Sequence, residues 1–163
     1  MKQFFKAKLI DPIIELLKQG ISPKKIAWSI AFGISLGVFP VLGSTVILCT
    51  IVTFLFRLNL VAIQLINYLV YPLQLALFIP FIRLGEFVLG REPFPLSMEL
   101  IFTMLKDDML NAIKTFWVAN LHGIFGWFLV GPLFTVVAYK VLVPILQQVP
   151  IEILTKEEKN GIS

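Results

Sequence analysis

The sequence predicts an all-α integral membrane protein that combines short broken or re-entrant helices, one or more spanning helices and amphipathic interfacial helices. Hydrophobic residues make up 58% of the 163 residues and charged residues only 15%, whereas about a quarter of the residues in a soluble domain are charged. Long uncharged stretches recur along the chain, and prolines and glycines divide them into helix-sized pieces. So few charges cannot cover the surface of a small soluble protein, which excludes an ordinary soluble enzyme.

The chain divides into three parts. Residues 1–19 predict an amphipathic interfacial helix, because apolar residues recur at helical spacing and lysines lie mostly on the other side. Packing of this helix against the protein's own core is the alternative. Residues 20–149 form a single helical membrane domain, and residues 150–163 form a polar C-terminal tail.

The most informative segment is Ile26–Phe56, which has no charged residue between Lys25 and Arg57. A single straight helix of this length would measure about 46 Å. The hydrocarbon core of a bilayer is only about 30 Å thick. One spanning helix therefore fits this segment poorly.

Pro40 and Gly43 interrupt the segment, and Ser44 or Thr45 can cap a new helix. We therefore predict two short helices, Ile26–Phe39 and Ser44–Phe56, joined by a tight turn, with Ser22 and Pro23 at the start of the first. A re-entrant hairpin, with both ends on one side of the membrane, fits their length better than two tilted crossings. The first helix carries two stripes of small residues at i, i+4 spacing, Ala27–Ala31–Ser35 and Ser29–Gly33–Gly37. Such stripes let helices pack closely inside one chain or in a homo-oligomer, and we prefer the first use.

Leu60–Ile82 is the clearest spanning candidate, with bends expected at Pro72 and Pro80. Its polar side chains recur at spacings of three and four residues, which places them on one helical face: Gln64, Asn67, Tyr71 and Gln74. Polar groups in lipid need partners. The stripe therefore either bonds neighbouring helices or lines a substrate path.

The second half of the chain repeats the broken pattern. After the loop Gly90–Pro95, Ser97 can cap a second amphipathic helix, Met98 to about Lys114. The apolar block Phe116–Val149 follows, with breaks expected at Gly131–Pro132 and Pro144. Two apolar blocks, each broken near its middle, are typical of the paired broken helices of transporters.

Charge asymmetry predicts the orientation. Six lysines precede the first apolar block, so we expect the N-terminus on the cytoplasmic side. In a hairpin Arg57 returns to that side, and the loop after Ile82 lies outside. The chain is predicted to be a multi-pass protein of the bacterial inner membrane.

Chemical signatures of an enzyme are absent from the sequence. It has no phosphate-binding glycine loop, no metal-ligand motif and no nucleophile motif, so no catalytic residue, metal or cofactor is predicted. Its single cysteine, Cys49, fits a small buried hydrophobe, and nothing indicates a nucleic-acid surface. His122 is either hydrogen-bonded structure or an acid–base group.

The turn at Pro40–Thr45 is the best candidate for a site. A helix start offers unpaired N–H groups and a positive dipole end, which together can hold an anion. Arg57, at the far end of the second arm, is either an interfacial anchor or a phosphate clamp that captures a headgroup before the turn receives it. The full set of candidate anion- or substrate-binding residues is Pro40, Gly43, Ser44, Thr45, Arg57, Asn59, Asn67, Gln74 and His122.

Three strings of this chain resemble a bacterial membrane family catalogued as domain of unknown function 2062: GISPKKIA from Gly20, AFGISLGVFPVLGST from Ala31 and FRLNL from Phe56. YPLQ at Tyr71–Gln74 resembles the family's Asn-Pro-Leu-Thr string but departs from it at its first and last positions. Arg83-Leu84-Gly85 also fits, so the resemblance covers roughly Gly20–Gly90 closely and the last apolar block loosely. It implies an integral inner-membrane protein without an established activity, in the neighbourhood of lipid-linked sugar chemistry.

Two functions from different classes fit these observations. The first is a transporter or flippase-like protein for an anionic amphiphile such as a lipid phosphate. The second is a non-transporting membrane scaffold or partner subunit for an envelope-lipid enzyme or glycosyltransferase. Polar groups that converge on a cavity near Pro40–Thr45 favour the first, and a dry packed interior favours the second. Membrane lipid is a partner in both.

Overall fold

The computed structural model describes residues 21–93, 103, 106 and 108–148, and all regular structure in these residues is helical. This confirms the all-α class. The helices are α3 (Pro23–Gly37), α4 (Thr45–Phe56), α5 (Leu60–Leu69), α6 (Tyr71–Val88) and α8 (Met109–Gln147). The predicted interfacial helix at 1–19, the tail at 150–163 and most of the helix predicted after Ser97 lie outside the described residues.

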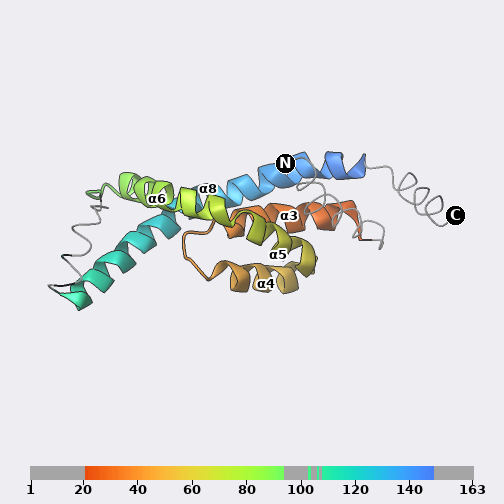
Figure 1. Cartoon of the computed structure of the whole chain (residues 1–163). Helices are drawn as coiled ribbons and strands as arrows, with labels where there is room; N and C mark the ends of the chain where they lie inside the picture. The colour runs from red at the N-terminus through yellow and green to blue at the C-terminus, as the bar shows by residue number, and fades with distance from the viewer. Residues whose placement is uncertain (1–20, 94–102, 104–105, 107, 149–163) are drawn as a thin grey trace.

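α8 runs along the length of the molecule, and both α3 and α6 pack against it (Figure 1). α3 also contacts α4 and α5, so it lies at the centre of the helical assembly. α3 and α4 form the predicted pair of short arms, and they begin at Pro23 and Thr45 rather than at Ile26 and Ser44. Ser22 caps α3 as expected, because its side chain accepts a hydrogen bond from the Lys25 N–H at 3.4 Å.

Both stripes of small residues on α3 are buried inside the chain. One stripe faces α5: a Cβ added to Gly33 would lie 2.8 Å from Ile66 Cβ, and a Cβ added to Gly37 would overlap Val70. The Ser29 hydroxyl accepts a 3.0 Å hydrogen bond from the Asn59 N–H, which ties the start of α5 to α3. The stripes therefore serve contacts within one chain.

The other stripe faces α8 through a reciprocal pair of hydrogen bonds. Ser35 Oγ donates to the Gly131 carbonyl at 3.0 Å, and the Trp127 indole N–H donates to the Ser35 carbonyl at 2.9 Å. Gly131 also leaves room for the Trp127 ring, since a Cβ there would lie 2.5 Å from it. The central helix is thus bonded as well as packed to α8.

The prediction of one helix over Leu60–Ile82 is wrong. The helix is interrupted at Val70, where a φ of −88° and a ψ of 2° separate α5 from α6. In a continuous helix the Pro72 ring would collide with the carbonyl of Tyr68, whereas in the first turn of a new helix the missing N–H has no cost. Pro80, by contrast, stays inside α6.

The predicted breaks at Gly131–Pro132 and Pro144 are also wrong, because α8 continues through both prolines. Thr135, after Pro132, donates from its hydroxyl to the Gly131 carbonyl at 2.8 Å and so links the two sides of that proline. Contacts with α3 hold the same stretch of α8. The second block is therefore one long helix, and it does not repeat the hairpin of the first.

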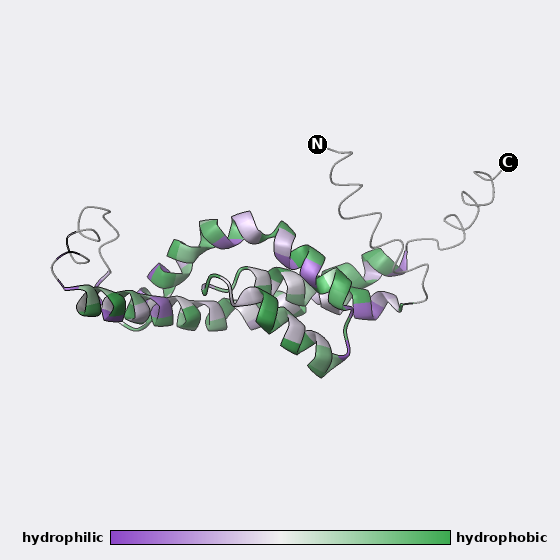
Figure 2. Ribbon diagram, turned by 60° about the horizontal axis from the view of Figure 1, so that its bottom comes forward, coloured by the Kyte–Doolittle hydropathy of each residue, from purple (hydrophilic) through white to green (hydrophobic). Residues whose placement is uncertain are grey.

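In the part of the chain that the structure describes, two helices, Tyr71–Val88 and Ala112–Gln147, are long and apolar enough to cross a membrane. Hydrophobic residues make up most of each helix, and hydrophilic residues lie mostly toward helix ends and loops (Figure 2). Phe54, Leu55 and Phe87 have exposed fractions of 73%, 72% and 83%. Water-soluble monomers rarely expose apolar surface on this scale.

The crossing of α6 and α8 depends on two glycines. A Cβ on Gly85 would overlap the carbonyl of His122, and a Cβ on Gly126 would overlap the carbonyl of Phe81. Both obstacles are backbone, which cannot move aside as a flexible side chain can. The two helices can therefore approach this closely only with glycine at both positions.

Gly85→Ala is expected to lower the free energy of unfolding by about 1–3 kcal/mol, because the added methyl overpacks the crossing. Helix propensity alone would make the alanine variant more stable, by about 1 kcal/mol. A lower stability would therefore come from the helix crossing. Thermal unfolding in detergent measures it, with Ala76→Leu on the exposed side of α6 as the control. A Gly85→Ala protein that melts at or above the parent temperature would contradict the close crossing.

Candidate functional site

The turn between α3 and α4 is held inside the molecule. Pro40 is fully buried and packs against α8, where a Cβ on Gly123 would lie 3.4 Å from the Pro40 ring. The Gln74 side-chain amide donates to the Phe39 carbonyl at 2.7 Å, and the Phe39 ring meets Trp127 edge-on at 5.0 Å. Residues from α6 and α8 thus fix the turn from two sides.

The start of α4 is uncapped by side chains. Gly43 has a φ of 84°, a left-handed conformation that favours glycine, and it lets the chain reverse before α4. Ser44 occupies the N-cap position, but its hydroxyl donates back to the Val41 carbonyl at 2.8 Å instead of accepting from α4. The predicted capping role of Ser44 is therefore wrong, and the first N–H groups of α4 receive no side-chain cap.

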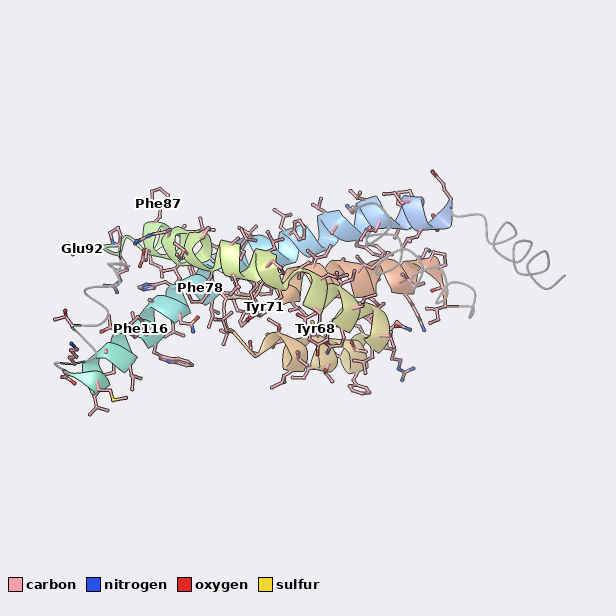
Figure 3. All side chains as sticks on the ribbon, viewed as in Figure 1. Tyr68, Tyr71, Phe78, Phe87, Glu92 and Phe116 are labelled. Carbon is pink, nitrogen blue, oxygen red and sulfur yellow. The ribbon has the colours of Figure 1, made fainter. Side chains whose placement is uncertain are left out.

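A cavity of about 300 Å³ opens beside this helix start. Gly43, Thr45 and Val46 line it from the turn and α4, and Asn67, Tyr68 and Tyr71 line it from α5 and α6. Figure 3 labels the two tyrosines beside the start of α4, and both are half-exposed or more. The lining contains no charged side chain, so the electrostatic feature of the cavity is the positive end of the α4 dipole.

A relay of amide groups joins α5 to this helix start. Gln64 Nε2 donates to the Val46 carbonyl and to Thr50 Oγ1, each at 3.0 Å. These two bonds fix the orientation of the Gln64 amide. Its oxygen, Oε1, then faces Asn67 and accepts a hydrogen bond from Asn67 Nδ2 at 3.2 Å. Asn67 is 3% exposed, and its Oδ1 has no hydrogen-bond partner in the described part of the chain.

The Thr45 side chain is the polar group best placed to meet a ligand. It is 6% exposed and lines the cavity, and within the described residues its hydroxyl makes no hydrogen bond. A hydroxyl beside uncapped N–H groups offers several donors to one acceptor. This arrangement fits a phosphate or carboxylate oxygen.

Arg57 and Asn59 lie away from this cavity. Arg57 ends α4 at the opposite end from Thr45, in a left-handed conformation, and α4 is 12 residues long, which corresponds to about 18 Å. Asn59 caps α5, since its side chain accepts from the Ala62 N–H at 2.8 Å. Neither can share an anion with the turn.

His122 belongs to another cavity, of about 260 Å³, at the crossing of α6 and α8. Its lining residues are Glu86, Glu92, Pro93, Thr115, Val118, Ala119 and His122. Glu86 is 2% exposed and accepts from Arg83 at 2.9 Å. In the described residues no group of His, Cys, Asp or Glu could hold a metal ion.

Residues 5–151 match the model of a family described as "Uncharacterized protein conserved in bacteria (DUF2062)". The chain belongs to this family. No curated protein and no solved structure matches it. The strings that carry the DUF2062 resemblance fall on the start of α3, on the stretch from mid-α3 through the turn into α4, and on the α4–α5 link. Gln74, the last residue of YPLQ, bonds the turn.

The structure thus brings together three of the predicted site residues, Gly43, Thr45 and Asn67, in one cavity. Pro40, Ser44 and Gln74 shape the turn, whereas Arg57, Asn59 and His122 lie elsewhere. The sequence prediction missed Tyr68, which is next to Asn67 but outside the expected polar stripe. It also missed Glu86, whose only signal is that it is the one carboxylate in α6.

Replacing Gln74 with Leu is expected to destabilise the protein by about 1 kcal/mol, because the Phe39 carbonyl loses its bond from α6 and keeps only the bond from the Val41 N–H, at 2.9 Å. Thermal unfolding in detergent would show the loss. Gln148→Leu, at an exposed position, is the matched control and should melt like the parent. Equal melting of all three proteins would mean that the bond from Gln74 does not hold the turn.

Proposed function

We propose that this DUF2062 protein is a small multi-pass protein of the bacterial inner membrane that binds an anionic amphiphile, such as a lipid phosphate, in a transporter or flippase-like role. The observation that carries the proposal is the uncapped start of α4, which opens into a cavity that also holds the hydroxyl of Thr45. The cavity offers hydrogen-bond donors for a headgroup. Apolar side chains around it suit lipid tails.

Three properties support a membrane location. Two helices have the length and composition of spans. Exposed Phe and Leu side chains on α4 would face lipid. From Ile21 to Ile82 the chain carries Lys24, Lys25 and Arg57 and no carboxylate, which is typical of a cytoplasmic end.

The depth of the turn supports handling of a lipid headgroup. If the Arg57 end of α4 lies at the cytoplasmic interface, the turn lies about 18 Å deeper. This is close to the middle of a core about 30 Å thick. Transporters bind their substrates at such depths, at the ends of broken helices.

The alternative is a non-transporting scaffold for an envelope-lipid enzyme or glycosyltransferase. The close glycine contacts of α3 with α5 and of α6 with α8 favour a rigid body of this kind. The two functions differ at the turn, because a scaffold needs no ligand there.

Binding of phosphatidic acid and of diacylglycerol with the same acyl chains, measured by native mass spectrometry in detergent, tests the proposal. The parent should prefer phosphatidic acid, and Thr45→Val should weaken its binding about tenfold, because a hydrogen bond to a charged group contributes about 1.5–3 kcal/mol. Thr53→Val is the matched control on the same helix, since its hydroxyl bonds only the Cys49 carbonyl. Both variants are also made with Arg57→Gly, which removes the cation at the other end of α4.

Absence of any preference for phosphatidic acid in the folded parent would exclude an anion site. An equal loss in Thr45→Val and Thr53→Val would show that the hydroxyl in the cavity has no special role. Either result would leave the scaffold as the better account.

Membrane topology is a separate prediction. In a Cys49→Ser background, cysteines at the exposed positions Lys24 and Arg57 should react with an impermeant reagent from the cytoplasmic side. A cysteine at Glu92, at the far end of α6, should react from the other side. Labelling of Lys24→Cys and Arg57→Cys from opposite sides would reject the hairpin.

A further inference from the structure

Four aromatic rings form a continuous stack across three helices at the end of the molecule opposite the turn. Tyr139 of α8 stacks on Trp28 of α3, with ring centres 4.0 Å apart and an angle of 14° between the planes. Trp28 stacks on Phe32 at 5.4 Å, and Phe32 stacks on Phe56 of α4 at 5.4 Å. We call these four residues the aromatic stack.

The aromatic stack borders a pocket of about 180 Å³, lined by Trp28, Phe32, Phe56 and Leu58. Arg57 lies between the last two of these residues in the sequence, so its backbone is at the edge of the pocket. Phe54, Leu55 and Phe56 are exposed beside it on α4. The four lining residues are apolar, and Arg57 is the sequence neighbour of two of them.

The backbone of Arg57 is left-handed, with a φ of 52° and a ψ of 46°. The next residue, Leu58, donates its N–H to the Thr53 carbonyl at 2.9 Å, which closes the end of α4 around this conformation. Glycine is the usual residue at such a position because a side chain there has a steric cost. An arginine in this conformation suggests a functional role for its guanidinium group.

Two further cations lie at the same end. The Ser29 hydroxyl donates to the Lys25 carbonyl at 2.8 Å and accepts from the Asn59 N–H at 3.0 Å, so the α4–α5 link is tied to the first turns of α3. In the part of the chain that the structure describes, Lys24, Lys25 and Arg57 have no carboxylate partner. All three are exposed, so an anion from outside these helices can reach them.

We propose that this end of the hairpin is a binding site for an anionic phospholipid, in which Arg57 pairs with the phosphate, Lys24 and Lys25 add positive charge, and an acyl chain lies on the aromatic stack. Guanidinium groups suit phosphate because they donate two parallel hydrogen bonds. Aromatic and basic residues are both enriched where a membrane protein meets the lipid headgroups. The site is separate from the cavity at Thr45 and does not depend on that cavity's function.

An acidic protein is the competing occupant, since it would also neutralise the three cations. The apolar pocket and the exposed phenylalanines beside Arg57 favour a lipid, because a phospholipid brings an anion and a hydrocarbon chain together. A phospholipid should therefore contact the Trp28 ring and the cations at once. This makes the fluorescence of Trp28 the natural probe.

The protein is placed in nanodiscs of equal phosphatidylglycerol and phosphatidylcholine, in which either lipid alone carries bromine atoms on its acyl chains. Both bilayers have the same surface charge, so only the identity of the lipid in contact with the indole differs. The Trp28 signal is the difference between the protein and its Trp28→Phe variant. We expect brominated phosphatidylglycerol to occupy the site about fivefold more than phosphatidylcholine does.

Arg57→Gly should reduce this preference to near equality while the protein melts no lower than the parent, since glycine suits the left-handed backbone. Asparagine also adopts the left-handed conformation readily. Arg57→Asn therefore provides the same quenching measurement if the glycine variant folds poorly. Lys114→Gln, on an exposed surface of α8 about seven turns from Tyr139, is the control for lost charge and should keep the preference.

Equal quenching of Trp28 by the two lipids in the folded parent would overturn the proposal and leave an acidic protein as the occupant. Equal losses in Arg57→Gly and Lys114→Gln would also overturn it, because the effect would then follow net charge. The preference would survive Thr45→Val if the two sites are separate, so failure of the anion site at the turn would not affect this result.

Discussion

The close approach of α3 to its neighbours is the contact on which the rest of the structure depends. Gly33 and Gly37 bring its backbone against α5, and Ser35 exchanges hydrogen bonds with α8. Because the side chains on both contact faces are small, the backbones of the neighbouring helices can approach α3 closely. In lipid, where no hydrophobic force drives helices together, packing and hydrogen bonds of this kind hold a helical protein.

The turn between α3 and α4 follows from this arrangement. A helix that ends inside the protein leaves backbone carbonyls and N–H groups that water cannot reach, and each must find a partner. Gln74 supplies one to the Phe39 carbonyl, while Ser44 turns its hydroxyl away from α4. The start of α4 therefore remains available at one cavity, and this distinguishes it from the capped start of α3.

Charge and polarity are separated along the molecule. The end formed by the starts of α3 and α5 is purely basic over the described residues, whereas the turn is polar and uncharged. The far end, where α6 meets α8, pairs Glu86 with Arg83 and carries both signs of charge. A phosphate attracted to the basic end would meet dipoles, not fixed charges, at the turn.

The sequence by itself determined the helical class, the interruption of the first apolar block and the use of small residues on α3, because these depend on local backbone chemistry and on side-chain size. Tertiary structure decided the rest. Pro72 divides a helix while Pro132 does not, since contacts with α3 hold α8 together on both sides of Pro132. The polar stripe on α5 and α6 became a relay to the α4 start only because α3 and α4 fold back on α5. Tyr68 and the aromatic stack could not be found in advance, because their neighbours are distant in sequence and only packing brings them together.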